Sequence, residues 1–346
     1  ATGGGAGSSS AGAGGSMSGS AAGANGGAAP ANAGAGVGGS GAGTGGAGAS
    51  GGTGAAGLGA AAGSGGRLDD NGGRGGTAGA SAGGAASTAD CSGAFGSPQV
   101  LVAGAKQVIL SSPTVPDDGL ELFFVEHDLA QGGAPRIMRA TQGAMFGDGA
   151  PVAELDSVCA STDERGISLT GDGLRLYVDC YMGTSTFTPG LVHVARRASR
   201  NASFTIDSAT YGTVGPQIDV TPDELTAFTS SEMNTTSPPR QYSRSSASDP
   251  FAMGQAVPGL ESVALGTPFL AADGLTLYGG VDPDLVFASR PAPGEPFGAT
   301  SPVFSGTKST VSYKAPELSA DCRTLYFVRI DTSGGASTYS LEVATR

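Results

Sequence analysis

Acidic side chains recur at regular intervals in the second part of this chain of 346 residues. Five aspartates lie in near-copies of one short phrase, for example AADGLTLYG at 271–279: they are Asp118, Asp172, Asp223, Asp273 and Asp321. Carboxylates that converge could hold a cation, bind a basic ligand, or act as acid and base. Aspartate before glycine more often accepts backbone hydrogen bonds within a tight turn. We therefore expect these five aspartates to form turns.

A second set of candidates lies four residues before each of these aspartates: Thr114, Ser168, Asp219, Phe269 and Glu317. Its two carboxylates could hold a cation or a basic ligand, or share the acid and base roles of a glycoside hydrolase, in which two carboxyl groups flank the scissile bond. Polar residues inside a closed β-structure more often contact ordered water. We expect these five residues to face a common channel, with ligand or cation binding by Asp219 and Glu317 as the functional hypothesis.

Other catalytic and metal-binding patterns are weak or missing. GASGG at 48–52 and GASAG at 79–83 match a serine-nucleophile motif, but they lie in a Gly/Ala/Ser tract without the strand and helix that the motif needs. No phosphate-binding Gly-Lys-Ser/Thr loop occurs. The cysteine spacing and the unrelated contexts of His127 and His193 argue against a metal site. We expect no cofactor, although the channel leaves room for a cation.

The elements that position these residues repeat about every fifty residues. The phrase starts at 116, 170, 221, 271 and 319. A short strand-like segment precedes each turn, an apolar run follows it, and a third strand-like segment such as DLVFASR at 284–290 comes later. A phenylalanine then opens the link to a fourth strand, at Phe95, Phe146, Phe204, Phe251 and Phe297. Four short antiparallel strands per repeat predict an all-β, five-bladed propeller over 91–346.

The repeat resembles the WD40-like Asp-Gly β-propeller repeats of the TolB type. Its closest copies are PELSADCRTLYF at 316–327 with SLEVATR at 340–346, and TPFLAADGLTLYG at 267–279 with DLVFASR. The resemblance covers about 95–346 and implies the architecture, without implying a function. Glu224 and Cys322 stand where the family has the turn glycine, so these two turns are expected to differ in type or to carry strain.

The order of the elements predicts how the ring closes. The domain begins with a fourth-strand element at Phe95 and ends just after a third strand at Arg346. We therefore expect residues 95–110 to pair with the strand around 340–346 and complete the fifth blade, which leaves no open edge. A Cys91–Cys322 disulfide would hold this closure, and Cys159 and Cys180 would then pair. Four cysteines allow three pairings, among which the sequence does not decide.

Residues 1–90 differ in composition from the rest. They hold 35 of the 62 glycines and no aromatic residue, so they cannot bury enough apolar surface to fold and are predicted to form a disordered linker. Residues 91–346 carry 16 basic and 27 acidic side chains. This acidity argues against nucleic acid or an anionic membrane as a partner, and no apolar run approaches the ~20 residues that span a bilayer.

These features together favour a non-catalytic, exported β-propeller on a flexible tether, acting as an interaction module for a protein or small ligand. We expect a monomer outside the cytoplasm, in the periplasm, at the cell surface or secreted, and a lipid anchor upstream of Ala1 would fit the tether. The alternative is a glycoside hydrolase or saccharide-binding propeller that uses the channel carboxylates. The absence of Trp argues against a cleft with aromatic platforms, so no enzymatic activity is expected.

Overall fold

Short antiparallel strands make up nearly all of the regular structure in the computed structural model of this protein. The structure describes residues 90–142, 146–147, 149–159, 164–182, 188–230, 237–307 and 309–346. In this part of the chain the strands form five four-stranded sheets, and one 3-10 turn, η1 (Ala153–Leu155), follows the first of them. The prediction of a disordered linker over 1–90 falls almost wholly outside the described residues.

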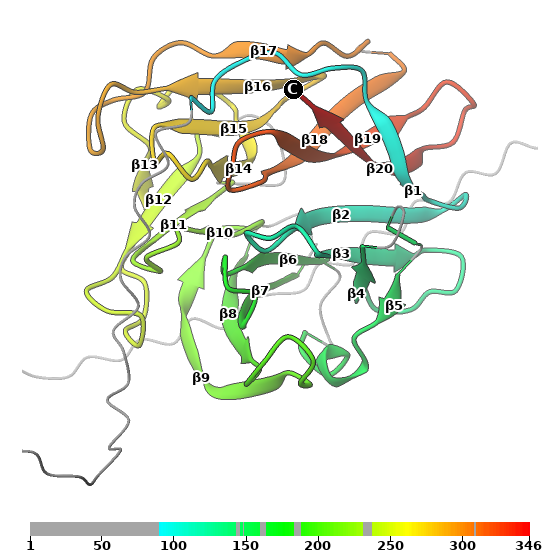
Figure 1. Ribbon diagram of the computed structural model, residues 1–346, viewed down its shortest axis with the longest axis vertical. Helices are drawn as coiled ribbons and strands as arrows, with labels where there is room; N and C mark the ends of the chain where they lie inside the picture. Colours follow the sequence, from blue (N-terminus) through cyan, green and yellow to red (C-terminus); the bar gives the residue numbers. More distant parts are fainter. Residues whose placement is uncertain are drawn as a thin grey trace, which may run out of the picture. The chain divides into compact units, whose positions relative to one another are not determined.

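Each sheet is one blade, and four of the five are continuous in sequence (Figure 1). Blade 1 contains β2 (Val108–Thr114), β3 (Glu121–Asp128), β4 (Arg136–Thr141) and β5 (Ala150–Pro151); blade 2 contains β6 (Glu164–Leu169), β7 (Arg175–Met182), β8 (Thr188–Arg196) and β9 (Thr205–Val214). Blade 3 contains β10 (Asp219–Val220), β11 (Thr226–Thr229), β12 (Arg240–Ser243) and β13 (Gln255–Ala256); blade 4 contains β14 (Gly266–Leu270), β15 (Thr276–Val281), β16 (Asp284–Ser289) and β17 (Ser301–Phe304).

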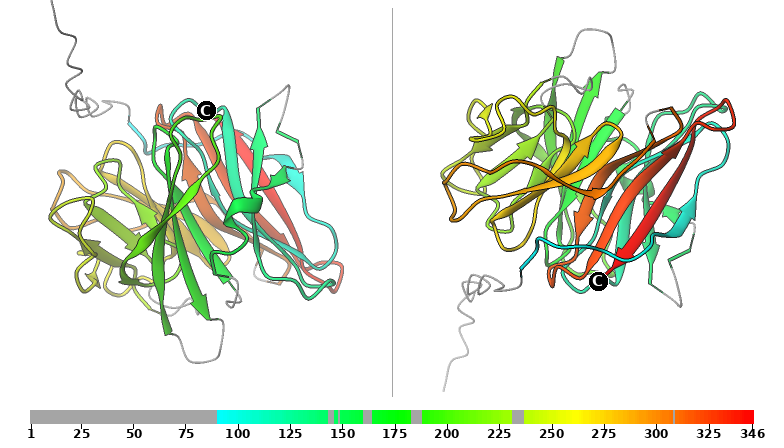
Figure 2. Two further views of the ribbon diagram at one scale, coloured as in Figure 1. Left: turned by 90° about the horizontal axis from the view of Figure 1, so that it is seen from below. Right: turned by 90° about the horizontal axis from the view of Figure 1, so that it is seen from above.

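Blade 5 joins the two ends of the domain. It is built from β18 (Val311–Leu318), β19 (Thr324–Asp331), β20 (Thr338–Thr345) and β1 (Gln99–Ala103). Strand β1 pairs antiparallel with β20, from Gln99 opposite Val343 to Ala103 opposite Ser340, and Figure 2 shows the cyan strand beside the red strands in both views. The predicted five-bladed fold and its closure are therefore confirmed. The predicted closing segment was too long, because Val108–Leu110 begin the first strand of blade 1.

The hydrophobic core is divided among the seams between blades. Each of five buried clusters draws its side chains from two neighbouring blades; one, for example, packs Phe123 and Ile137 of blade 1 against Leu176 and Val178 of blade 2. The apolar residues three before each turn aspartate lie in these clusters, as the repeat predicts: Val115, Leu169, Val220, Leu270 and Leu318. Apolar burial therefore holds each blade to the next.

The cysteines pair as Cys91–Cys322 and Cys159–Cys180. The first bridge ties the segment before β1 to the turn between β18 and β19, so it reinforces the closing blade. The second joins the segment after η1 to β7. Two disulfides suit an oxidising environment outside the cytoplasm. The described part of the chain contains no helix long and apolar enough for a membrane span.

We predict that the closing disulfide contributes more stability than the other one. Cys91–Cys322 spans 231 residues and Cys159–Cys180 spans 21, and the chain-entropy model assigns losses of about 5 and about 3 kcal/mol to their removal. Urea unfolding of the two double Cys→Ser variants measures the difference. An equal loss of unfolding free energy in the two variants, or a larger loss in the Cys159/Cys180 variant, would contradict the greater contribution of Cys91–Cys322.

Candidate functional site

The five residues predicted to face the channel belong to the inner strands or their ends, and four of them are used to join blades. Each polar side chain accepts a hydrogen bond from the backbone N–H of a residue in the next blade around the ring. The bonds are Leu169 N to Thr114 Oγ1 (3.0 Å), Val220 N to Ser168 Oγ (3.0 Å), Leu270 N to Asp219 Oδ2 (2.8 Å) and Val115 N to Glu317 Oε1 (3.3 Å). All four side chains are buried. We call these contacts the inter-blade bonds.

Phe269 interrupts this series, because its side chain has no oxygen to accept the N–H of Leu318 at the fifth seam. Its ring packs against the core cluster between blades 4 and 5. Phe269 also borders the channel with Asp219 and Glu317. The structure thus brings these three predicted residues to one cavity, whereas Thr114 and Ser168 serve the seams.

Burial shifts the two channel carboxyl groups toward their neutral forms. Burial raises the pKa of Asp219 to about 7, opposed only in part by the N–H of Leu270. Burial also raises the pKa of Glu317 well above its ordinary value, and the nearby charge of Asp219 raises it further. Thr114 donates a hydrogen bond of 3.2 Å to Glu317 Oε1. The two groups are therefore an electrostatically coupled pair that binds a proton at neutral pH.

The channel is too narrow at this pair for a sugar ring. Two cavities border Asp219 and Glu317, of about 30 Å³ and about 60 Å³, and each has room for water molecules only. The walls of the first include the apolar residues five before each turn aspartate, of which Ile167 and Ile218 also pack between blades: Pro113, Ile167, Ile218, Pro268 and Pro316. The alternation is disturbed because the residue just before these has a positive φ in four blades: Ser112, Gln217, Thr267 and Ala315.

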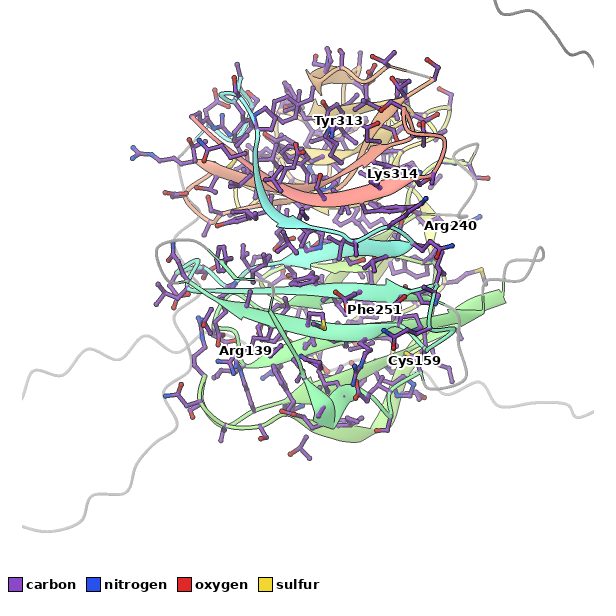
Figure 3. The ribbon with its side chains drawn as sticks, turned by 90° about the vertical axis from the view of Figure 1, so that its right-hand side faces the viewer. Arg139, Cys159, Arg240, Phe251, Tyr313 and Lys314 are labelled. Atoms are coloured by element: carbon purple, nitrogen blue, oxygen red, sulfur yellow. A yellow bond between two sulfur atoms is a disulfide. The ribbon has the colours of Figure 1, made fainter. Side chains whose placement is uncertain are left out.

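Two roomier cavities lie at the end of the channel remote from the Asp-Gly turns, and we call them the mouth cavities. One, of about 180 Å³, lies mainly between blades 5 and 1 and is lined by His127, Tyr339 and several aliphatic side chains. The other, of about 120 Å³, is lined by Ser230, Ser237, Asp282 and Tyr313 among others. Gln217, Thr267 and Lys314 line both cavities. Figure 3 labels Lys314 and Tyr313, which are neighbours on β18.

The polar residues at the mouth fall into two groups. Ser230 Oγ accepts the N–H of Thr267 and donates to Gln217 Oε1, and Thr267 Oγ1 accepts the N–H of Ala315, so these side chains also link blades. His127 and Lys314 differ, because within the described residues neither side chain has a recorded hydrogen bond or ion pair. Both have donor capacity left for a ligand, as do the hydroxyl groups of Ser237 and Tyr313 in the smaller cavity, for which no hydrogen bond is recorded among the described residues.

Sequence reasoning treated His127 as uninformative and did not select Lys314. Both residues lie outside the repeated phrase, and their convergence depends on blades 1 and 5 being neighbours. The predicted closure was the one signal that could have brought them together. No sequence pattern marked either residue as polar and unpaired.

The repeated aspartates do form turns, as expected. In each blade the aspartate Oδ1 accepts the backbone N–H two residues later, at 2.8 to 3.0 Å. Glu224 and Cys322, in place of the turn glycine, both have a φ of 61°. These two residues therefore adopt the left-handed conformation that glycine would adopt at lower cost.

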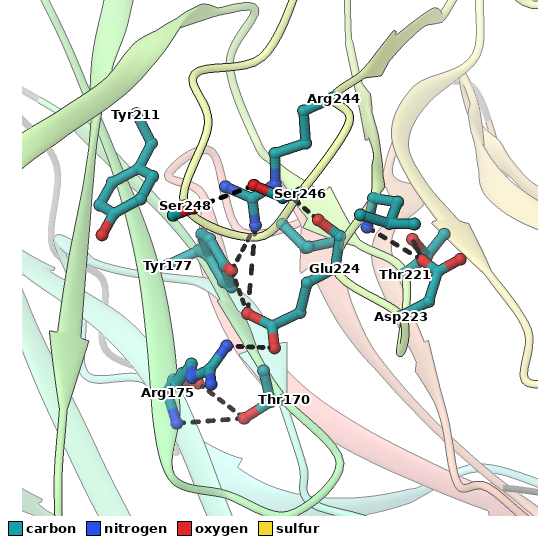
Figure 4. Close-up of polar contacts among 12 residues, drawn as sticks. Thr170, Arg175, Tyr177, Tyr211, Thr221, Asp223, Glu224, Arg244, Ser246 and Ser248 are labelled. Atoms are coloured by element: carbon teal, nitrogen blue, oxygen red, sulfur yellow. Dashed lines mark hydrogen bonds and ion pairs between the residues drawn. The ribbon is translucent and has the colours of Figure 1, made fainter. Parts of the chain in front are cut away.

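Sequence reasoning also missed an arginine that joins each turn to the phenylalanine link in blades 2 to 5. The guanidinium lies over the ring at 4.3 to 4.8 Å, in the pairs Arg197–Phe204, Arg244–Phe251, Arg290–Phe297 and Arg346–Phe95. Each arginine Nε also donates to a carbonyl in the turn. Figure 4 shows how Arg244 additionally contacts Tyr177 and Glu224, with Arg175 on the far side of Glu224. These arginines are structural.

A metal centre has no support in the described residues. No three His, Cys, Asp or Glu side chains there are grouped to bind a metal ion. Asp219 and Glu317 offer two carboxyl groups whose raised pKa values favour protons over cations. A cation in the channel therefore remains a prediction, and Asp219 and Glu317 are its two candidate ligands.

We predict that Asp219 makes the protein less stable as the pH rises. Below about pH 4 the carboxyl is protonated in both states, but from there to about pH 7 the folded protein keeps a proton that the unfolded chain releases. Asp219→Asn should therefore unfold much as the wild type does at pH 4 and be more stable at pH 8, by at most about 4 kcal/mol. Urea unfolding at both pH values measures this, with the exposed Glu295→Gln as control. A variant equally destabilised at both pH values would contradict the burial argument.

Comparison with known proteins finds the propeller fold and no family. No family model matches the chain, and no curated protein matches it. The solved structures similar to it include the periplasmic gluconolactonase PpgL of Pseudomonas aeruginosa, at 19% identity over 66% of this chain and 70% of that one, with a TM-score of 0.36. The GH43_1 enzyme of Xanthomonas citri complexed with xylotriose has 14% identity over 72% and 89% of the two chains and a TM-score of 0.48.

A third neighbour is a putative 6-phosphogluconolactonase from Bacteroides uniformis, with 8% identity over 67% of this chain and 70% of that one and a TM-score of 0.38. The expectation that this protein lacks enzymatic activity is contradicted by these neighbours, which are described as enzymes. The lack of Trp and of aromatic platforms was a poor reason for that expectation. At these identities the likeness shows the fold alone, so the specific TolB-type resemblance remains a resemblance and the chain has a five-bladed propeller fold.

Proposed function

We propose that this protein is a saccharide-binding propeller whose ligand occupies the mouth cavities. The proposal rests above all on the convergence there of His127 and Lys314, unpaired among the described residues, with the hydroxyl and amide groups of Thr267, Ser230 and Gln217. Together the two cavities reach the ~300 Å³ at which small-molecule sites begin. Apolar walls with a few convergent polar groups suit a sugar, which has an apolar ring face and a hydroxyl periphery.

The linings of the two cavities suit different parts of a sugar. The cavity between blades 5 and 1 has aliphatic walls formed by Ile109, Val328 and Ile330, against which a ring face can pack. The cavity beside β14 is lined by serines and a carboxylate, which suit hydroxyl groups. The sequence favoured an interaction module for a protein or a small ligand. The proposed saccharide site corresponds to the small-ligand form of that interpretation.

Hydrolysis of the bound saccharide is a second candidate function, supported by the coupled carboxyl pair. The cavity of Asp219 and Glu317 shares Gln217, Thr267 and Ala315 with the larger mouth cavity. A neutral Glu317 could donate a proton to a leaving group, while ionised Asp219 could accept one from a water molecule. Because the cavities beside the pair have room for water molecules only, the scissile bond would have to lie near Gln217 and Thr267.

The location of this activity is part of the proposal. Two disulfides and an acidic domain suit an exported protein. Residues 1–90 would then act as a tether. Periplasmic, surface-anchored and secreted forms are all compatible with this proposal, and the acting unit is proposed to be a monomer.

We predict that His127→Ala weakens saccharide binding about tenfold, because one hydrogen-bond donor and part of the cavity wall are lost. Isothermal titration with xylose, glucose, xylobiose and glucuronate measures the dissociation constants, and circular dichroism checks the fold. His193→Ala, the other histidine of the chain, is the matched control and should bind as the wild type does. Equal weakening by both changes, or no binding of any of the four sugars, would contradict the proposed site.

The hydrolytic candidate is separable from binding. If it holds, Asp219→Asn and Glu317→Gln should each lower the rate of release of p-nitrophenol from aryl glycosides by about 10²-fold or more. Their sugar dissociation constants should change little, since neither residue lines the larger mouth cavity. If the wild type and the double variant release p-nitrophenol at equal rates, the hydrolytic function is rejected and only the binding function remains.

A further inference from the structure

Lys314 is the basic group of the mouth, and the described structure leaves it without an acidic partner. Every ion pair recorded among the described residues is formed by an arginine. The chain has 30 acidic and 18 basic side chains, yet Lys314 lines both cavities without a recorded ion pair among the described residues. Asp282 lines the smaller cavity with Lys314, yet the two form no ion pair within 4.0 Å.

The position of Lys314 restrains its side chain. It stands on β18 opposite Val328 of β19, and the side chain is half-buried. A Cβ placed on Gly280 of the neighbouring blade would lie 3.6 Å from Lys314 Cγ, so the start of the lysine stem lies beside this glycine. Lys314 lines both mouth cavities, and a long stem of this kind can pack while its charged head reaches polar surroundings.

The surrounding groups suit one small anionic group on a polyhydroxylated molecule. His127, on β3, adds an imidazole to the lining of the larger cavity. Thr267 and Gln217 line both cavities. Neither lining contains an arginine, the residue best suited to bind a phosphate through two parallel hydrogen bonds. A single ammonium balances the single charge of a carboxylate, and the net charge of −12 disfavours a dianion.

We infer that Lys314 binds the carboxylate of a sugar acid, so that the mouth selects acidic over neutral saccharides. This inference rests on the proposed function and adds the ligand class. The ammonium would donate a charge-assisted hydrogen bond to the carboxylate, and the sugar hydroxyls would meet Thr267, Gln217 and the serines of the smaller cavity. A neutral sugar would leave the ammonium without a counter-charge and bind more weakly.

The test compares glucuronate with glucose, which differ at one carbon, by isothermal titration at pH 7 and low salt. The wild type should bind glucuronate at least tenfold more tightly than glucose, because hydrogen bonds to charged groups are the stronger ones. Lys314→Gln should remove this preference, chiefly by weakening the binding of glucuronate at least tenfold. Lys314→Arg should retain most of the preference, because it keeps the charge.

Lys106→Gln is the matched control, since Lys106 is exposed and lines neither mouth cavity; it should keep the full preference. Thermal unfolding of each variant guards against a loss of fold. Equal affinity of the wild type for both sugars, or a preference that survives in Lys314→Gln, would overturn the assignment to Lys314 while leaving saccharide binding intact. Failure of both sugars to bind would overturn the proposed function as well. Tighter binding of glucose 6-phosphate than of glucuronate would reject the carboxylate in favour of phosphate.

Discussion

A backbone N–H that points from one inner strand to a side-chain oxygen of the preceding blade is the contact on which the ring depends. Four of the five seams have it, through Thr114, Ser168, Asp219 and Glu317. An inner strand has no sheet neighbour on its channel side, so this bond satisfies a donor that would otherwise be buried unpaired. It also brings the inner strands close together, which narrows the channel at the carboxyl pair to cavities of about 30 Å³ and about 60 Å³.

This use of the channel has a consequence for function. Oxygens that accept a backbone N–H are already committed to assembly, and the space between them admits little more than water. We therefore propose that a ligand binds at the mouth, where the inner strands start and where His127 and Lys314 have no recorded partner among the described residues. The fold supplies a rigid rim, and the chemistry depends on residues that differ from blade to blade.

The repeat predicted what is periodic and missed what is local. Five copies of the Asp-Gly phrase predicted the number of blades, the turn role of Asp118 and its counterparts, and the pairing of the first and last strands. The phrase could not predict the left-handed residues at Ser112, Gln217, Thr267 and Ala315, because none is a glycine. His127 and Lys314 were missed because they lie 187 residues apart and become neighbours only through ring closure. The arginines and phenylalanines recur at matching places in the repeats, but only the structure shows that each guanidinium lies over a ring.

We propose that this propeller holds a saccharide acid at the mouth remote from the Asp-Gly turns. A crystal structure of the protein soaked with glucuronate would show where the sugar binds. We expect electron density for the sugar ring between the walls of the mouth cavities, with its carboxylate within hydrogen-bond distance of Lys314 Nζ. Ordered glucuronate at the Asp-Gly end of the channel, or at the mouth with its carboxylate turned away from Lys314, would contradict the claim.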